Sequence, residues 1–344
     1  MSSFIGKIPY FIMAILAFSL LIIIHELGHF MLAKLNGVKV HEFSLGMGPK
    51  IFGIKGKETE YLIKAFPIGG YVKMEGENEE SDDPRSLANK TPWQKLSIVS
   101  AGAIMNIILA FVLFSIIGAS IGGDTMPTVG DLVPNSPALH AGIKVGDKIT
   151  KVNKVNIEKW DQFVNEISTS KGKSTTIEIV RNSKLEKFTL TPIMNEKENK
   201  FMIGIAGLQK KLNFGEAVGY GFNQTINTSK MIFGIFGSIF KGKVSINDVG
   251  GPISIIRIST MFAQAGIINL MLLTAMLSVQ LGILNIIPFP ALDGGWIFIL
   301  LFEIISGKKL DDKKVAAVNY VGFMILMAFM VFIVIKDIVN PMKF

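Results

Sequence analysis

The chain of 344 residues is 49% hydrophobic and 18% charged, whereas an ordinary soluble domain carries roughly 25% charged residues. It has no cysteine, which excludes a thiol protease, a disulfide scaffold and a cysteine-bound zinc site. Its formal net charge of +8 is explained more economically by membrane topology than by nucleic-acid binding, so we expect no nucleic-acid partner.

Charged residues are absent from four long windows of the sequence, 8–24, 96–123, 258–292 and 315–335. Each window is close to or above the roughly 17–25 residues that cross a bilayer. We therefore predict four transmembrane helices, at about 8–33, 94–122, 263–290 and 314–337. The first window continues into a histidine and a glutamate without a small-residue cleavage site, which favours a retained span over a signal peptide.

Basic residues give these spans a direction. Segment 34–95 holds ten Lys or Arg residues, and the short loop after Asp293 adds Lys308, Lys309, Lys313 and Lys314. By the positive-inside rule both loops are expected in the cytoplasm, and both termini outside it.

Residues 38–92, within the first of these cytoplasmic segments, begin with alternating apolar and polar residues interrupted by glycines. This pattern predicts short strands and turns. The acidic run within 75–83 is interpreted as a solvated loop rather than a cation site.

After the second span, residues 124–208 have the composition of a small soluble domain. The sequences Ser-Pro-Ala at 136–138 and Ala-Gly-Ile-Lys-Val-Gly-Asp at 141–147 resemble a bacterial PDZ domain. PDZ domains add a peptide to a sheet edge, so this resemblance implies a peptide or protein ligand, with a simple spacer as the alternative. Segment 214–243 then predicts an amphipathic helix at the membrane surface, in preference to a fifth span, because Lys230 interrupts it.

The sharpest chemical signal is His-Glu-Leu-Gly-His at 25–29. On a helix His25 and His29 share one face, separated by about 6 Å of rise, so both imidazoles can bind one ion. Glu26 then lies beside the metal, where it can accept a proton from an attacking water. Ionisable groups inside a membrane span usually mark function, although hydrogen bonds between helices are an alternative explanation.

A catalytic zinc ion usually has three protein ligands, so two histidines are not enough. His41 is near in sequence, but it falls in the glycine-rich strand region and is interpreted as an ordinary polar residue. Asp293 closes a long uncharged run in which Pro288 and Pro290 exclude a regular helix. Because the second span leaves the cytoplasm and the third returns, Asp293 arrives on the same side as His25 and His29. We predict these three residues as the zinc ligands.

Two motifs, His-Glu-Leu-Gly-His at 25–29 and Asn-x-x-Pro-x-Pro-x-Leu-Asp-Gly-Gly at 285–295, resemble those of site-2-type intramembrane zinc metalloproteases. In particular, the arrangement resembles the bacterial RIP metalloproteases of the RseP (regulator of sigma-E protease) group. This resemblance covers essentially the whole chain. It implies a zinc endopeptidase of the bacterial inner membrane, with Glu26 as the catalytic base and with the zinc site near the cytoplasmic side. It also implies a second cut in single-pass membrane proteins, such as anti-sigma factors or signal-peptide remnants, after a first cut outside.

Weaker matches to this family concern substrate binding. Asn106 ends a Gly-x-x-x-Asn pattern and is either a contact to the substrate or oxyanion, or a packing residue. Asn285 is a similar amide, and Gly69, Gly70 and Tyr71 lie in a segment that resembles the family's membrane-associated β region. Only one PDZ domain fits the length of the chain, where some relatives have two.

The predicted fold class is an α-helical polytopic membrane protein with four transmembrane helices, a membrane-associated β region and one inserted PDZ domain of α+β structure. Its partners would be the lipid bilayer, the substrate and a peptide ligand of the PDZ domain, which lies outside the cytoplasm. A non-enzymatic scaffold and a metal transporter are the rival functions.

The expected order of domains along the chain is 1–37 first span, 38–92 cytoplasmic β region and acidic loop, 93–123 second span, 124–208 PDZ domain, 209–262 amphipathic linker, 263–295 third span, and 296–344 cytoplasmic loop and fourth span.

Overall fold

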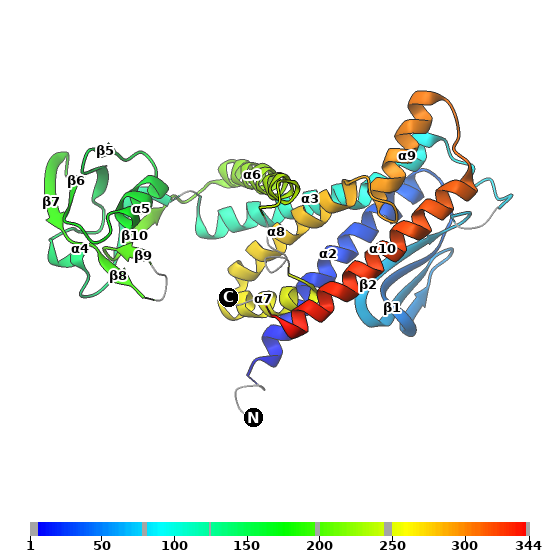
Figure 1. The fold of residues 1–344 in the computed structure, drawn as a ribbon, viewed down its shortest axis with the longest axis horizontal. Coiled ribbons are helices and arrows are strands. Elements are labelled where there is room, and N and C mark those ends of the chain that lie inside the picture. Colours follow the sequence, from blue (N-terminus) through cyan, green and yellow to red (C-terminus); the bar gives the residue numbers. More distant parts are fainter. Residues whose placement is uncertain (1–5, 78–80, 124, 197–199, 244–249, 342–344) are drawn as a thin grey trace. The chain divides into compact units, whose positions relative to one another are not determined.

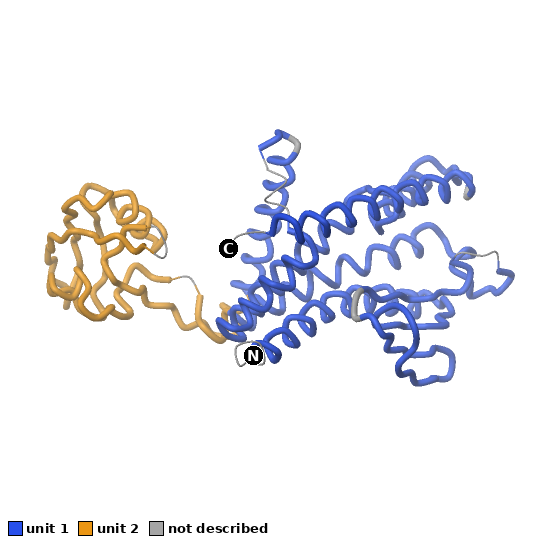
Figure 2. Tube along the Cα trace, turned by 60° about the horizontal axis from the view of Figure 1, so that its bottom comes forward, with its two compact units in different colours: residues 1–117, 219–344 blue, residues 118–218 orange. Residues whose placement is uncertain are grey.

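The computed structural model describes residues 6–77, 81–123, 125–196, 200–243 and 250–341 (Figure 1). The chain divides into two compact units, residues 1–117 together with 219–344, and residues 118–218 (Figure 2). Parts of the predicted acidic loop (78–80), PDZ domain (124 and 197–199) and linker (244–249) lie outside the described residues.

The first unit is dominated by apolar helices. Four of them are long and apolar enough to cross a membrane, judged by length and composition: α2 (Ile8–Leu35), α3 (Pro92–Ile121), α8 (Ile267–Ile286) and α10 (Asp312–Val339). They agree with the four predicted spans. The amphipathic helix α6 (Phe214–Phe240) is not among them, and its Ile232 packs with Ala110 of α3 and Val279 of α8.

The third predicted span differs in detail from the structure. A separate helix, α7 (Pro252–Gln264), ends before Gly266, whose φ of +124° favours glycine, and α8 begins immediately afterwards. Helix α8 ends at Ile286, before the two prolines. The segment after Asp293 was expected to be a cytoplasmic loop, but it forms the apolar helix α9 (Asp293–Ser306), with 14 residues too short for a span.

Two long antiparallel strands, β1 (Val40–Lys55) and β2 (Glu60–Met74), form the predicted β region. The sequence predicted shorter strands, because its glycines were interpreted as turns. Gly46 and Gly48 instead lie within β1 at positive φ, where the register between the strands shifts. Val40 and Val72 join Ala33 of α2 and Ile98 of α3 in one buried cluster, which fixes the sheet to the helices.

Near its C-terminal end, α10 is hydrogen-bonded to α7 through a buried carboxylate. Asp337 accepts hydrogen bonds from the backbone nitrogen and the hydroxyl of Ser254, at 3.0 and 2.9 Å. Ser254 lies in the first turn of α7, whose amide groups have no partner within the helix. Asp337 therefore caps α7 from another helix, and α7 in turn packs against α2.

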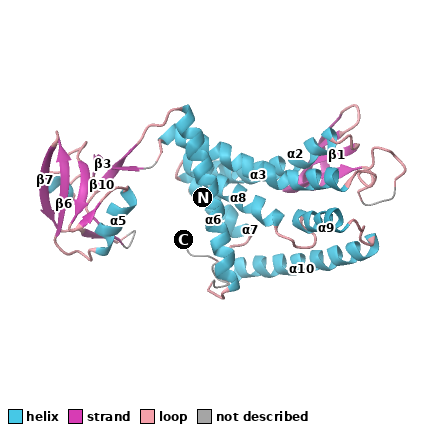
Figure 3. Cartoon of the chain, turned by 90° about the horizontal axis from the view of Figure 1, so that it is seen from above, coloured by secondary structure: helices cyan, strands magenta, loops and turns pink. Residues whose placement is uncertain are grey.

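In its described residues, the second unit combines a main sheet and a separate two-stranded sheet with two short helices (Figure 3). The elements are β3 (Thr125–Leu132), α4 (Pro137–His140), β4 (Lys148–Val152), β5 (Val155–Asn156), α5 (Trp160–Thr169), β6 (Thr175–Arg181), β7 (Lys184–Leu190), β8 (Ile193–Asn195), β9 (Lys200–Met202) and β10 (Ile205–Gln209). Its main sheet has the strand order β10-β3-β4-β6-β7, with β5 paired to β4, and its core includes Val129, Ile149, Phe163 and Ile177.

One ion pair, between the partly exposed Arg181 and the buried Asp147, joins this sheet to the loop after α4. Arg181 donates to both carboxylate oxygens of Asp147, at 2.7 and 2.6 Å, and to the carbonyl oxygen of Gly142 at 2.9 Å. Burial alone would raise the pKa of Asp147, but the hydrogen bonds from Arg181 and from the Lys144 amide outweigh it and lower that pKa below 3.8. The stabilisation is therefore present above pH 3.8 and is lost as the pH falls through the lower folded-state pKa.

Replacing Arg181 by methionine is expected to destabilise this unit by about 3 kcal/mol, because Asp147 would remain as a buried, unpaired charge. Hydrogen exchange in β4 and β6 of the full chain should then be roughly 100-fold faster at neutral pH. The control is Lys187→Met, which removes the exposed Lys187–Glu178 pair and should change the rate by less than about fivefold. Equal rates in the two variants would contradict a structural role for the Arg181–Asp147 pair.

Candidate active site

Helix α2 presents two imidazoles on one face. His25 and His29 are one turn apart, and their Nε2 atoms lie 3.2 Å from each other. The spacing of four residues along a regular helix is what brings them together. Both side chains are largely buried, each with a side-chain exposure of 12%.

The third ligand atom comes from the opposite end of the sequence. Asp293 is the first residue of α9, after the irregular segment that contains the two prolines. Its Oδ2 atom lies 3.1 Å from His25 Nε2 and 3.3 Å from His29 Nε2. One ligand atom from each of the three residues can be chosen so that all lie within 4.8 Å of one another. The structure therefore brings together the three residues that the sequence predicted as ligands.

The donor set fits a zinc ion. His29 Nδ1 lies 2.9 Å from the carbonyl oxygen of Ile98, so in the neutral ring Nδ1 carries the proton and Nε2 presents its lone pair. Asp293 Oδ2 is buried and has no hydrogen-bond donor among the described residues. These acceptor atoms have no hydrogen-bond donor and lie close together, so a cation between them would satisfy them. Two imidazoles with one carboxylate are ligands that catalytic zinc takes.

Helix α3 approaches the two histidines through a glycine. A Cβ atom on Gly102 would lie 2.6 Å from Cε1 and 2.8 Å from Nδ1 of His25, and closer still to Nε2 of His29. On α2, a Cβ atom on Gly28 would similarly overlap the backbone of Ala101. These two glycines allow α2 and α3 to pack closely at the ligand cluster.

Residues 13–329 match the model of Peptidase family M50. The chain belongs to peptidase family M50. This is the family of site-2 proteases, and the chain is a zinc metalloprotease of the RseP type.

Relatives of this M50 protease match along nearly their full length. A Clostridium acetobutylicum protein, named as a candidate zinc metalloprotease, is 48% identical over 97% of this chain and 98% of its own. The Bacillus subtilis regulator of sigma-W protease RasP is 29% identical over 94% of this chain and 97% of its own. The PDZ domain structure of an SdrC-like protein from Listeria monocytogenes is 22% identical, covers 25% of this chain and 87% of its own, and has a TM-score of 0.21, too low to establish a shared fold.

In this M50 chain, Glu26 lies where β2 touches α2. A Cβ atom on Gly70 would lie 3.0 Å from Cγ of Glu26 and 2.9 Å from the carbonyl oxygen of Ser44. The backbone of β2 therefore passes directly beside the predicted base, and Gly70 is required for that approach. Of the weaker sequence predictions, Gly70 is thus placed at the site.

The two predicted amides also reach the ligand cluster. The Nδ2 atoms of Asn106 and Asn285 lie 3.3 and 3.4 Å from Nδ1 of His25. Asn106 is fully buried on α3, whereas Asn285 is partly exposed near the end of α8.

Other predicted residues lie outside the cluster. The hydroxyl of Tyr71 donates to Glu42 and accepts a hydrogen bond from Lys64, at 2.6 Å for the latter. A Cβ atom on Gly69 would meet the side chain of Met47. His41 pairs with Glu75 at 2.7 Å, as suits the ordinary polar residue that was predicted.

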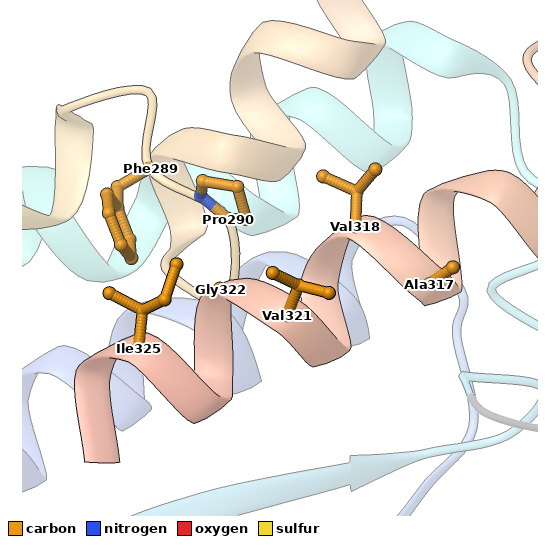
Figure 4. A pocket seen from close by; sticks show the side chains of 7 residues that line it. All are labelled: Phe289, Pro290, Ala317, Val318, Val321, Gly322 and Ile325. Carbon is orange, nitrogen blue, oxygen red and sulfur yellow. The ribbon is translucent and has the colours of Figure 1, made fainter. Parts of the chain in front are cut away.

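Helix α10 contacts the turn at Pro290 and Ala291, which immediately precedes Asp293. Ala291 has a φ of +73°, unusual for a residue other than glycine, and its amide donates to Asn319 Oδ1 at 3.3 Å. Gly322 allows the backbone of Pro290 to approach α10 closely. Beside this contact is an apolar pocket of 330 Å³, shown in Figure 4, lined by Phe289, Pro290, Ala317, Val318, Val321, Gly322 and Ile325.

Sequence reasoning missed two contributors from α3, the Ile98 carbonyl and Gly102. A backbone carbonyl carries no residue-type signal. Gly102 belongs to the Gly-x-x-x-Asn pattern, and the spacing 98, 102, 106 places all three residues on one face of a helix, which was the available clue.

Proposed function

We propose that this M50 metalloprotease cuts single-pass membrane proteins within the membrane, as the second cut of regulated intramembrane proteolysis. Anti-sigma factors, signal-peptide remnants or both would be its substrates. The observation that carries this proposal is the position of the cluster: two of its three ligands lie on α2, one of the four helices apolar enough to span a membrane. A relative named as a regulator of sigma-W protease supports an anti-sigma substrate.

His25, His29 and Asp293 would hold the zinc ion. When bound there, zinc supplies Lewis-acid chemistry, which polarises a peptide carbonyl and stabilises negative charge on its oxygen.

Glu26 would act as the general base. Its carboxylate would accept a proton from the water that attacks the scissile carbonyl and would return it to the departing amine. It follows His25 directly on the helix, and its side chain, beside β2, is only partly exposed to bulk water. The carboxylate is therefore held near the reaction centre without itself being a ligand.

A substrate helix must unwind before cleavage, because its carbonyl groups are occupied by its own hydrogen bonds. The segment of β2 containing Gly69, Gly70 and Tyr71 would bind the extended substrate, since Gly70 already brings strand backbone beside Glu26. Asn285, partly exposed near the cluster, would donate its amide hydrogens to substrate carbonyls.

The sheet unit would bind a peptide or protein as a PDZ domain does. Strand β10 lies at one edge of the main sheet, with β3 as its neighbour. Trp160 at the start of α5 packs against Gly207 of that strand. An edge strand flanked by a helix suits the addition of a peptide strand. The basic loops favour an orientation with this unit outside the cytoplasm and with the zinc site near the cytoplasmic side.

The test uses the purified chain with a single-pass substrate in lipid vesicles. We expect cuts within the apolar segment, mapped by mass spectrometry, which disappear after chelation and return with Zn²⁺. Asp293→Ala should lose both zinc and cleavage, whereas Asp82→Asn, at an exposed carboxylate, should retain both. Cuts confined to soluble segments, or full zinc content in Asp293→Ala, would contradict the proposal.

A further inference from the structure

The second nitrogen of His25 faces a buried amide that has an unsatisfied atom. Asn106 is fully buried on α3, and its Oδ1 has no hydrogen-bond partner within the described part of the chain. Its Nδ2 faces Nδ1 of His25 at 3.3 Å. A buried amide oxygen without a partner is costly, so this arrangement requires an explanation.

The protonation pattern of His25 explains the unsatisfied oxygen of Asn106. Nε2 of His25 faces Asp293 and His29, so it is the atom that would bind zinc, and a neutral ring then carries its proton on Nδ1. Two donors, Nδ1–H and Nδ2–H, would oppose each other. A half-turn of the carboxamide exchanges Oδ1 and Nδ2 with little change in shape. It gives the orphaned oxygen a donor and gives Nδ1–H an acceptor.

His29 shows the same arrangement with a backbone acceptor. Its Nδ1 faces the carbonyl oxygen of Ile98, two helical turns before Asn106 on the same face of α3. The position of Asn106 is itself fixed, because its carbonyl oxygen accepts a hydrogen bond of 2.7 Å from the buried Ser278 on α8. One face of α3 thus meets the non-ligating nitrogens of both histidines.

We propose that Asn106 is a positioning residue whose side-chain oxygen accepts the Nδ1–H of His25 and so fixes Nε2 as the zinc ligand. This rests on the proposed ligand role of His25. It differs from a contact to substrate or oxyanion, because the amide acts through the histidine. Asn285 approaches the same nitrogen at 3.4 Å but is partly exposed, which leaves it available to the substrate.

The test measures zinc affinity by competition with a chelator in the full chain. Asn106→Leu, similar in size but without an acceptor, should bind zinc about 10- to 100-fold more weakly, and Asn106→Asp, which keeps an acceptor, should stay within about threefold of wild type. Asn285→Leu should bind zinc as wild type does. Thermal unfolding of each metal-free variant identifies any general loss of folding.

Four results would overturn the proposal. Wild-type zinc affinity in Asn106→Leu would show that the amide does not act on the ligand. Equal weakening in Asn106→Asp and Asn106→Leu would show that the acceptor is not what matters. A larger effect of Asn285→Leu would assign the role to the other amide. The His25→Leu variant separates this from the ligand assignment, since full zinc content there would reject His25 as a ligand and the positioning role with it.

Discussion

Replacing Gly102 by alanine is expected to abolish zinc binding, although the substitution adds only one methyl group and removes no ligand. The new carbon would lie 2.6 and 2.8 Å from two atoms of the His25 ring and would also overlap His29. Carbon atoms do not approach ring atoms so closely, so either an imidazole turns away or α2 and α3 separate. Zinc content should fall from about one ion per chain to near zero, and cleavage by at least about 100-fold.

The control for this prediction is another helical glycine replaced by alanine. Apart from the backbone of its own helix, no described atom lies within 4 Å of the position that a Cβ on Gly234 of α6 would take, so Gly234→Ala should keep zinc and activity. Because alanine favours a helix over glycine by about 1 kcal/mol, neither variant should fail through helix propensity. Stoichiometric zinc in Gly102→Ala, measured by atomic absorption, would show that α3 does not pack on the histidines in this way.

The second large effect is expected from Glu26→Gln. Glutamine has the shape of glutamate but cannot accept the proton, so zinc content should remain at the wild-type level. Cleavage of a membrane substrate should fall by about 10²–10⁴-fold. The measurement is single-turnover cleavage alongside metal content, with Glu158→Gln as a control at an exposed glutamate.

This variant also separates the protease from its rivals. A membrane scaffold or a metal transporter has no need of a proton acceptor at residue 26, so its function would survive in Glu26→Gln. Undiminished cleavage would remove Glu26 from the proposed chemistry. Together, Gly102→Ala and Glu26→Gln distinguish loss of the metal from loss of the base.

Much of the site could be predicted from sequence because its signals are local or topological. Two histidines four residues apart define a helical face, and their position within a charge-free run limits what can partner them. Asp293 lies more than 250 residues after the histidines in sequence. It could be predicted as a ligand only because the order of the spans puts it on the same side of the membrane as they are. Hydrophobicity and charge are read directly from residue types, so the four long helices followed from them.

The remainder depends on packing, which residue types do not determine. Whether Gly102 meets an imidazole or a lipid depends on how α3 is rotated against α2, and the same is true of the Asn106 side chain. Helix α9 was missed because a helix of 14 residues satisfies no length criterion for a span, although Gly307 in the left-handed region ends it as a helix cap should. The break at Gly266 was hidden inside one continuous uncharged run.

The two ends of the sheet unit lie next to each other, since the amide of Gly123 donates to the carbonyl oxygen of Lys210 at 2.8 Å. Residues 118–218 are therefore an insertion with adjacent ends, of the kind that can be exchanged without rerouting the rest of the chain. All residues of the ligand cluster belong to the other unit. Under the proposed role of this unit in recognition, exchanging the insertion would change which proteins the enzyme binds, while the ligand cluster in the other unit would stay the same.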